Sequence, residues 1–290
     1  MKLSIKIIFI FLLFCQIDAL ASKNIFWEVN SKSGTTVYLL GSIHMADSTF
    51  YPLDNYIEDS FNKSDYLVTE IDIKNVNPMS LLDKMTYPFS DSLSAYIADT
   101  TMEKLVNYFS DKGMNRIFLN RLKPAFIVLT ISNMEYLKAG ITPEYGIDLH
   151  FTNKIGDKEL IELETADYQI NVIDMLNKKG TEDAIINSTL DDIANISNDI
   201  KEIINNWKQG DIIALEQNLA EEESTDIPEN EDFNKELIDT RNMNMTKKII
   251  SFLETKENKK YFVIVGAAHL IGDNGIIRLL EKDGFKPKRK

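Results

Sequence analysis

Two short segments, more than two hundred residues apart, place a histidine at the same position of a Gly-x-x-His pattern. The first segment is Gly41-Ser-Ile-His44 and the second is Gly266-Ala-Ala-His269. Imidazole nitrogens bind divalent metals and transfer protons near neutral pH. A single histidine after an apolar run is commonly a structural hydrogen-bonding residue. Because two of the three histidines in the chain share one local frame, we expect them to converge on one site.

Two glutamates also stand at the ends of apolar runs. Glu70 follows Tyr66–Thr69, and Glu164 follows Ile161–Leu163. A carboxylate in such a setting is costly to bury unless it meets a cation or a strong hydrogen-bond donor. Imidazole and carboxylate without thiolate suit zinc, manganese or cobalt. These residues therefore predict a divalent-metal site, the alternative being carboxylates that end strands at a solvated sheet edge.

A metal held by His44, His269 and Glu70 would support hydrolysis. With one coordination position open, such an ion lowers the pKa of bound water and polarises a carbonyl group. Glu164 is then expected to act as a further ligand or as general base. The chain contains no G-x-S-x-G, H-E-x-x-H, P-loop or G-x-G-x-x-G pattern, so those catalytic motifs are excluded.

Strands must deliver these side chains to one place. Four apolar runs rich in β-forming residues predict them: Thr36–Leu40, Tyr66–Thr69, Ile161–Leu163 and Tyr261–Val265. Apolar residues at helical spacing predict helices at Leu105–Tyr108, Phe126–Leu137, Ile170–Leu176 and Asn234–Glu254. Strands separated by helices favour an α/β fold with a mixed, largely parallel sheet, whose strand carboxyl ends carry the site. Gly41 and Gly266 permit the sharp exits from two of these strands.

Other segments surround this framework. An excess of helical pattern predicts a helical lobe inserted at about 78–140, and a second helical stretch is expected from Asp167 to Leu219. The acidic segment at about 220–232 lacks apolar periodicity and is expected to be a solvated loop. We expect the basic end, Lys286–Lys290, to be frayed.

The first residues, 1–21, have the features of a signal peptide. Lys2 and Lys6 precede the apolar run Ile7–Phe14, and Ala19-Leu-Ala21 matches a small-x-small cleavage site. The apolar run is about half the roughly 20 residues that a membrane-spanning helix needs, so a permanent anchor is not expected. We therefore predict an exported protein, periplasmic or secreted, whose residues 22–290 form a single domain.

Composition limits the mature protein further. Cys15 is the only cysteine, so removal of the signal peptide leaves no disulfide and no thiolate metal ligand. With 44% hydrophobic residues, the chain can bury a sizeable core. The net charge of -13 repels phosphate backbones, so nucleic acid is not an expected partner.

At this point the residues resemble the TraB/PrgY/GumN family, which includes the animal TIKI proteins and is distantly similar to erythromycin-esterase and ChaN-like folds. Matching segments run in the family's order across nearly the whole mature chain. They are Tyr38–His44, Glu70–Asp72, Pro143–His150, Leu163–Thr165 with Gln169, Trp207–Asp211, Arg241-Asn242, and Val265–Leu270 with Gly272 and Gly275.

The resemblance implies a TIKI-like metalloprotease that uses both Gly-x-x-His motifs and a glutamate, with a peptide or small molecule as substrate. It also implies that Arg241 and Asn242 face the site, and it draws attention to Asp148 and His150 as secondary candidates. Ala125 stands where many relatives have an aromatic residue, which implies a different pocket wall.

Two other functions stay open at the sequence level. Similarity to ChaN-like folds allows the same histidines to bind haem or another ligand without catalysis. A site that has lost its activity, on a protein whose acidic surface contacts partners, is the other alternative. The intact pair of Gly-x-x-His motifs argues against a site that has lost its activity.

Overall fold

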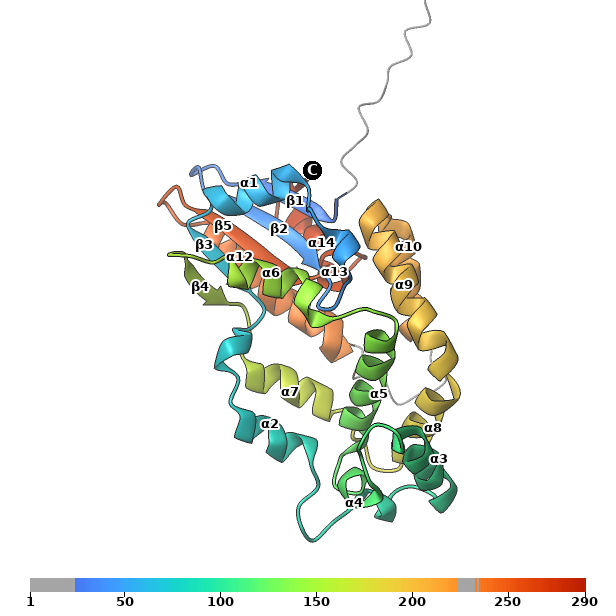
Figure 1. The fold of residues 1–290 in the computed structure, drawn as a ribbon. Coiled ribbons are helices and arrows are strands. Elements are labelled where there is room, and N and C mark those ends of the chain that lie inside the picture. Colours follow the sequence, from blue (N-terminus) through green and yellow to red (C-terminus); the bar gives the residue numbers. More distant parts are fainter. Residues whose placement is uncertain (1–23, 224–232, 234) are drawn as a thin grey trace, which may run out of the picture.

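The computed structural model of the chain describes residues 24–223, 233 and 235–290 (Figure 1). The predicted signal segment 1–21 and most of the acidic segment lie outside the described residues. The first part of the acidic segment was expected to be a loop, which is wrong, because helix α10, Ile212–Glu223, continues through it. In the described part of the chain, we find no helix with the length and apolar character that crossing a membrane requires.

A six-stranded sheet with the order β4-β3-β5-β2-β1-β6 forms the centre of the fold. The strands are β1 (Phe26–Asn30), β2 (Thr36–Ser42), β3 (Tyr66–Thr69), β4 (Glu159–Glu162), β5 (Lys260–Gly266) and β6 (Lys288–Arg289). Pairing is parallel from β4 through β3 and β5 to β2, and antiparallel at β1. The predicted α/β class with a mixed, largely parallel sheet is thus confirmed.

The sheet edges differ most from the prediction. β4 ends one residue before the predicted Leu163, and β1 had no prediction. The basic carboxyl end is not frayed: β6 pairs with β1, and the amide of Lys290 donates to the carbonyl of Phe26 at 2.9 Å. Lys290 also forms an ion pair of 3.1 Å with Glu28, so backbone and charge together hold this end.

Helices account for most of the remaining residues that the structure describes. The long ones are α1 (Asn55–Lys63), α2 (Pro78–Met85), α3 (Asp99–Phe109), α5 (Pro124–Lys138), α7 (Ala166–Asp174), α8 (Glu182–Asp191), α9 (Ile193–Gln209), α10 and α12 (Arg241–Leu253). Shorter ones are η1 (Ser48–Phe50), η2 (Ile73–Asn75), η3 (Leu93–Ala95), α4 (Arg116–Leu119), η4 (Pro143–Tyr145), α6 (Ile147–Asn153), the π-helical η6 (Lys235–Thr240), α13 (Ala267–Leu270) and α14 (Ile276–Lys282).

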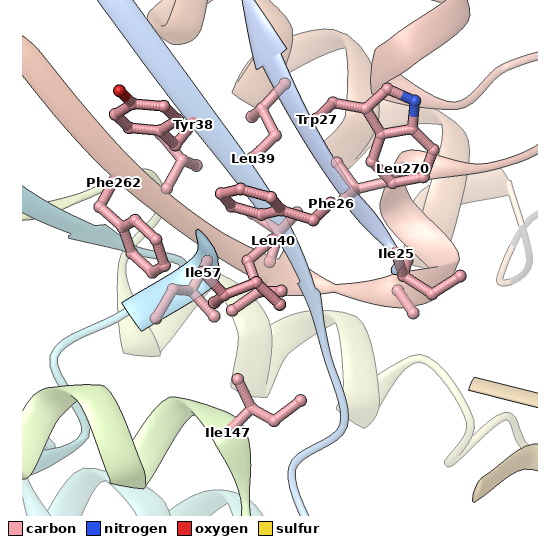
Figure 2. Close-up of a cluster of buried hydrophobic side chains, with 14 of the residues drawn as sticks. Ile25, Phe26, Trp27, Tyr38, Leu39, Leu40, Ile57, Ile147, Phe262 and Leu270 are labelled. Carbon is pink, nitrogen blue, oxygen red and sulfur yellow. The ribbon is translucent and has the colours of Figure 1, made fainter. Parts of the chain in front are cut away.

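The main core lies on the central strands, because β2 is buried along its whole length and β5 along its middle. Figure 2 shows Phe26 beside Tyr38 and Phe262 within this core. The ring of Phe26 stacks on Tyr38 with the ring centroids 6.1 Å apart. Burial of these large side chains is the dominant stabilising contribution to the sheet.

The helices between Pro78 and Gly140 form a lobe away from the sheet (Figure 1). This lobe has its own apolar cluster, to which α3 contributes Leu105 and Phe109 and α5 contributes Ile127 and Ile131. α8 packs on the same cluster through Ile186. The predicted helical insertion is therefore present as a packed unit that extends beyond the carboxyl ends of the strands.

Candidate functional site

The register of the parallel strands brings the two Gly-x-x-His segments to one edge of the sheet. Gly41 in β2 pairs with Val265 in β5, and Ser42 pairs with Gly266. Both strands therefore end at the same level, and each histidine comes shortly afterwards. His44 lies beyond β2 as expected, whereas His269 lies within the short helix α13 rather than in a loop.

Glu70 reaches the same edge from the other side of β5, because β3 pairs with β5 up to Thr69 and Ile264, whereas β2 pairs with β5 on its opposite side. The amide of Gly266 donates to Oε1 of Glu70 at 2.7 Å. The same oxygen lies 3.8 Å from Nε2 of His269. One oxygen of the buried Glu70 carboxylate is thereby directed at the histidine.

Hydrogen bonds at the other ring nitrogen fix how each histidine faces Glu70. Asn242 donates its amide to the carbonyl of Asn274 at 2.9 Å, so its Oδ1 is the acceptor for Nδ1–H of His269 at 2.7 Å. Nδ1 of His44 lies 2.9 Å from Oδ2 of Asp148, a carboxylate acceptor. In both rings Nε2 is left to act toward the site, as is usual for metal-binding histidines.

Ser42 adds a further support on the His44 side. Its hydroxyl donates to Oδ1 of Asp148 at 2.9 Å, which holds the second oxygen of that carboxylate. Sequence reasoning assigned no role to Ser42. The sequence feature that could have indicated a role for Ser42 is its position inside the Gly41–His44 segment.

Arg241 binds both candidate carboxylates. Its Nη2 donates to Oε2 of Glu70 at 2.6 Å, and its Nε donates to Oε2 of Glu164 at 2.9 Å. Gln169 bridges the same two oxygens, with its Nε2 2.8 Å from Glu70 and 3.0 Å from Glu164. The structure therefore places Glu164 against Arg241 and Gln169, while Oε1 of Glu70, which accepts the Gly266 amide, faces His269.

Local structure explains how these partners reach the site. Backbone pairing continues past β4, because the amide of Glu164 donates to the carbonyl of Glu70 at 2.8 Å. The side chain of Thr165 caps α7, and Gln169 lies in the first turns of that helix. Arg241 follows the π-helical turn η6, a distortion that is frequent at functional sites.

His150, a secondary candidate, is not brought to this place. Its Nε2 lies 2.9 Å from Oε1 of Glu58, and its ring packs on Tyr51 with the centroids 4.6 Å apart. Asp148, in the same short helix α6, does reach His44. Of the two candidates in the Pro143–His150 segment, only Asp148 contributes to the cluster.

The electrostatics of the cluster give its members different protonation behaviour. Burial alone would raise the pKa of Glu70, but the facing His269 and His44, the Arg241 guanidinium and the Gly266 amide outweigh it and lower that pKa to about 2. Burial lowers the pKa of His269 to about 4. The carboxylate of Asp148 raises the pKa of His44 to about 9. At neutral pH and without an ion, Glu70 is therefore ionised, His269 is neutral and His44 is protonated, so a metal bound by Nε2 of His44 would displace its proton.

These side chains line a cavity of about 510 Å³. His44, Glu70, Arg241, Gly266 and His269 all contribute to its surface. The His44 side chain is 67% exposed, whereas that of His269 is 6% exposed. The site therefore combines an accessible histidine with a buried one, both lining a space of the size that small ligands occupy.

Gly266 leaves room between the three expected metal ligands. A Cβ at this residue would lie 3.5 Å from Oε1 of Glu70, 3.6 Å from Cδ2 of His269 and 4.0 Å from Nε2 of His44. The donor set and the orientation of both rings fit a divalent ion with two imidazoles and one carboxylate. Among the described residues no group of three or more His, Cys, Asp or Glu side chains forms a ready-made metal site, so an ion would have to draw the ligands closer together.

Fold and site together define an α/β protein with a His–Glu–Arg cluster at the carboxyl ends of a mostly parallel sheet. The sequence model of the TraB/PrgY/gumN family matches residues 25–289. The chain belongs to this family.

Individual relatives match at low identity. The uncharacterized protein YbaP of Escherichia coli (strain K12) is 25% identical over 250 residues, covering 84% of this chain and 87% of that protein. The metalloprotease TIKI homolog of Amphimedon queenslandica is 21% identical over 314 residues, covering 91% of this chain and 61% of the relative. Metalloprotease TIKI2 of Xenopus tropicalis is 35% identical over 54 residues, which are 19% of this chain and 10% of that protein. No solved structure matches the chain.

Proposed function

We propose that this protein is an exported, metal-dependent hydrolase that cleaves peptide bonds. The observation that carries the proposal is the convergence of both imidazole rings and Oε1 of Glu70 around Gly266, with both Nδ1 atoms held by acceptors. Membership of a family that shares sequence with TIKI metalloproteases supports the same activity.

His44, His269 and Glu70 are the proposed ligands of zinc, manganese or cobalt. Held by these three side chains, such an ion would supply hydrolytic chemistry, namely a water of lowered pKa and polarisation of the scissile carbonyl. Asp148 and Asn242 keep Nε2 of the two rings directed at the site through their bonds to Nδ1. Arg241 and Gln169 both donate to Oε2 of Glu70, whereas Oε1 accepts the single Gly266 amide and faces His269, so Oε1 would be the oxygen that binds the ion.

We assign Glu164 to positioning Arg241 rather than to proton transfer. Both of its oxygens accept bonds from Nε of Arg241, at 3.1 and 2.9 Å. Its side chain is 2% exposed, which separates it from water. The guanidinium of Arg241 in turn compensates the negative charges of two buried carboxylates, Glu70 and Glu164, which would otherwise repel each other.

A cleavage assay tests the activity. Purified mature protein is incubated with a peptide library, with and without a chelator, alongside His269→Ala and His150→Ala. We expect cleavage by wild type and His150→Ala, abolished by the chelator and restored by one of the three ions, and none by His269→Ala. Chelator-resistant cleavage, or equal cleavage by His269→Ala, is incompatible with the proposal.

The remaining parts of the proposal rest on the sequence. Export depends on residues 1–21, which the structure does not describe. We expect the intact mass of the exported protein to match a chain that begins at Ser22. Haem binding by the same histidines is the alternative. A Soret band on titration with haem would favour that alternative, and we expect none.

A further inference from the structure

One wall of the cavity is apolar, and helices supply it. The polar residues His44, Glu70 and His269 come from the ends of strands or just beyond them. The opposite surfaces come from α7, α9, α10 and η6. Apart from Gln169 and Asn218, the described residues that these helices contribute are aliphatic: Val172, Ile173, Ile203, Leu215, Leu237 and Ile238.

Glu70 and Arg241, which line the cavity, are already engaged with each other, and His44 is paired with Asp148. Glu70 and Arg241 are paired at 2.6 Å, and the described residues that α7, α9, α10 and η6 contribute to the cavity include no Lys, Arg, Asp or Glu. Asn218, the polar side chain contributed by α10, bonds Asn206 at 3.0 Å and Glu202 at 3.3 Å. A charged group placed against this wall would lose water without gaining a partner.

We propose that this apolar wall binds a large apolar side chain of a peptide substrate, beside the bond that is cleaved. The cleavage part of this inference rests on the proposed function. The volume of about 510 Å³ has room for an aromatic or large aliphatic side chain together with adjoining backbone. An apolar group would bury against Ile203, Leu215 and their neighbours without leaving a polar atom unpaired.

Peptides that differ in one central residue test the inference. The probes are octapeptides with Phe, Leu, Ala, Glu or Lys at that position, and both calorimetric binding and cleavage are measured with wild type. We expect Phe and Leu peptides to bind at least about tenfold more tightly than the Ala, Glu and Lys peptides. Equal binding of the Phe and Glu peptides overturns the inference, whatever the cleavage result.

Variants of the wall locate the preference. Ile203→Ala should reduce the preference for Leu over Ala, and Ile203→Asp should shift it toward Lys. Ile213→Asp is the control on the neighbouring helix, because Ile213 is 69% exposed and does not line the cavity. An unchanged preference in folded Ile203→Ala contradicts the inference. Apolar-selective binding without any cleavage would instead reject the proposed function and keep the pocket.

Discussion

Gly41 and Gly266 occupy the same position in the two Gly-x-x-His segments, yet a methyl group would meet different surroundings at each. At Gly41 a Cβ would lie 2.5 Å from Cγ2 of Ile25 and 3.0 Å from the backbone of Ala267. At Gly266 the nearest atoms are those of the proposed ligands, at ordinary contact distances, and the backbone φ of -49° suits alanine. The first glycine serves packing and the second keeps the site open.

This difference gives a paired prediction. Gly41→Ala should destabilise the fold by about 1–3 kcal/mol through overpacking, as measured by urea denaturation. Gly266→Ala should retain near wild-type stability but bind a divalent ion at least about tenfold more weakly, because the methyl group occupies the space between the ligands. Wild-type affinity in Gly266→Ala would show that the ion does not bind there.

Asn242 positions the imidazole ring of His269 through a hydrogen bond to Nδ1. It is fully buried, and its Oδ1 accepts the Nδ1–H that fixes the ring. Loss of such a support commonly lowers metal affinity by about 10–100-fold. We expect this loss in Asn242→Ala and not in Asn244→Ala, whose side chain is exposed on the same helix. Isothermal titration calorimetry of the folded variants with each ion measures the metal affinity. Equal affinities of the two variants would show that Asn242 does not support the metal site.

The buried His269 makes stability depend on pH. Its pKa of about 4 in the folded protein lies below the usual value of about 6.5 in an unfolded chain. As the pH falls, His269 is therefore protonated in the unfolded chain before it is protonated in the folded protein. The contribution of neutral His269 to the free energy of unfolding is complete above pH 6.5 and declines as the pH falls toward 4. In chelator-treated protein, we expect the free energy of unfolding of wild type to fall by on the order of 2 kcal/mol more than that of His269→Gln between pH 6.5 and pH 4. Parallel pH profiles of the two urea-denaturation midpoints would contradict this.

At the scale of elements, Arg241 joins η6 and α12 to the ends of β3 and β4. It contacts Leu237, Glu70 and Glu164, and its side chain is 8% exposed. Removing it leaves two buried carboxylates without their cation. The arrangement therefore ties the helical wall of the cavity to the sheet.

Replacement of this arginine should accordingly be costly. We expect Arg241→Gln to lower the free energy of unfolding by about 3–5 kcal/mol. Arg278→Gln, which removes an exposed ion pair with Glu281, should cost less than about 1 kcal/mol. Chemical denaturation of both variants measures the contrast. A loss in Arg241→Gln as small as in Arg278→Gln would show that the pair contributes little.

The sequence was sufficient to predict the elements whose pattern is local. β2, β3 and β5 are continuous apolar runs, and their parallel alignment follows from the helices between them. β1 and β6 escaped prediction because β6 has only two polar residues, and its pairing with Phe26–Asn30 depends on contacts across the whole chain. Glu70 could be predicted to lie near His269, because both follow local apolar runs that end at one edge of the sheet. The roles of Ser42 and Gln169 could not be predicted, because they depend on side-chain contacts between distant segments.

At the scale of the whole molecule, the site lies where the sheet meets the helices that extend from it. The strand ends supply chemistry, while α7, α9, α10 and η6 supply an apolar surface. Amphipathic periodicity predicts that these helices bury one face but does not determine which side chains line a shared cavity. The proposed substrate preference could therefore be inferred only from the packed structure.

Metal content tests the central claim most directly. Mature wild type, His269→Ala and His150→Ala are each loaded with zinc, manganese or cobalt, freed of excess ion and analysed by mass spectrometry of the elements. We predict one tightly held ion per chain in wild type and in His150→Ala, and none in His269→Ala. Wild type that retains none of the three ions, or His269→Ala that retains one as wild type does, would contradict a metal centre built on the two Gly-x-x-His segments.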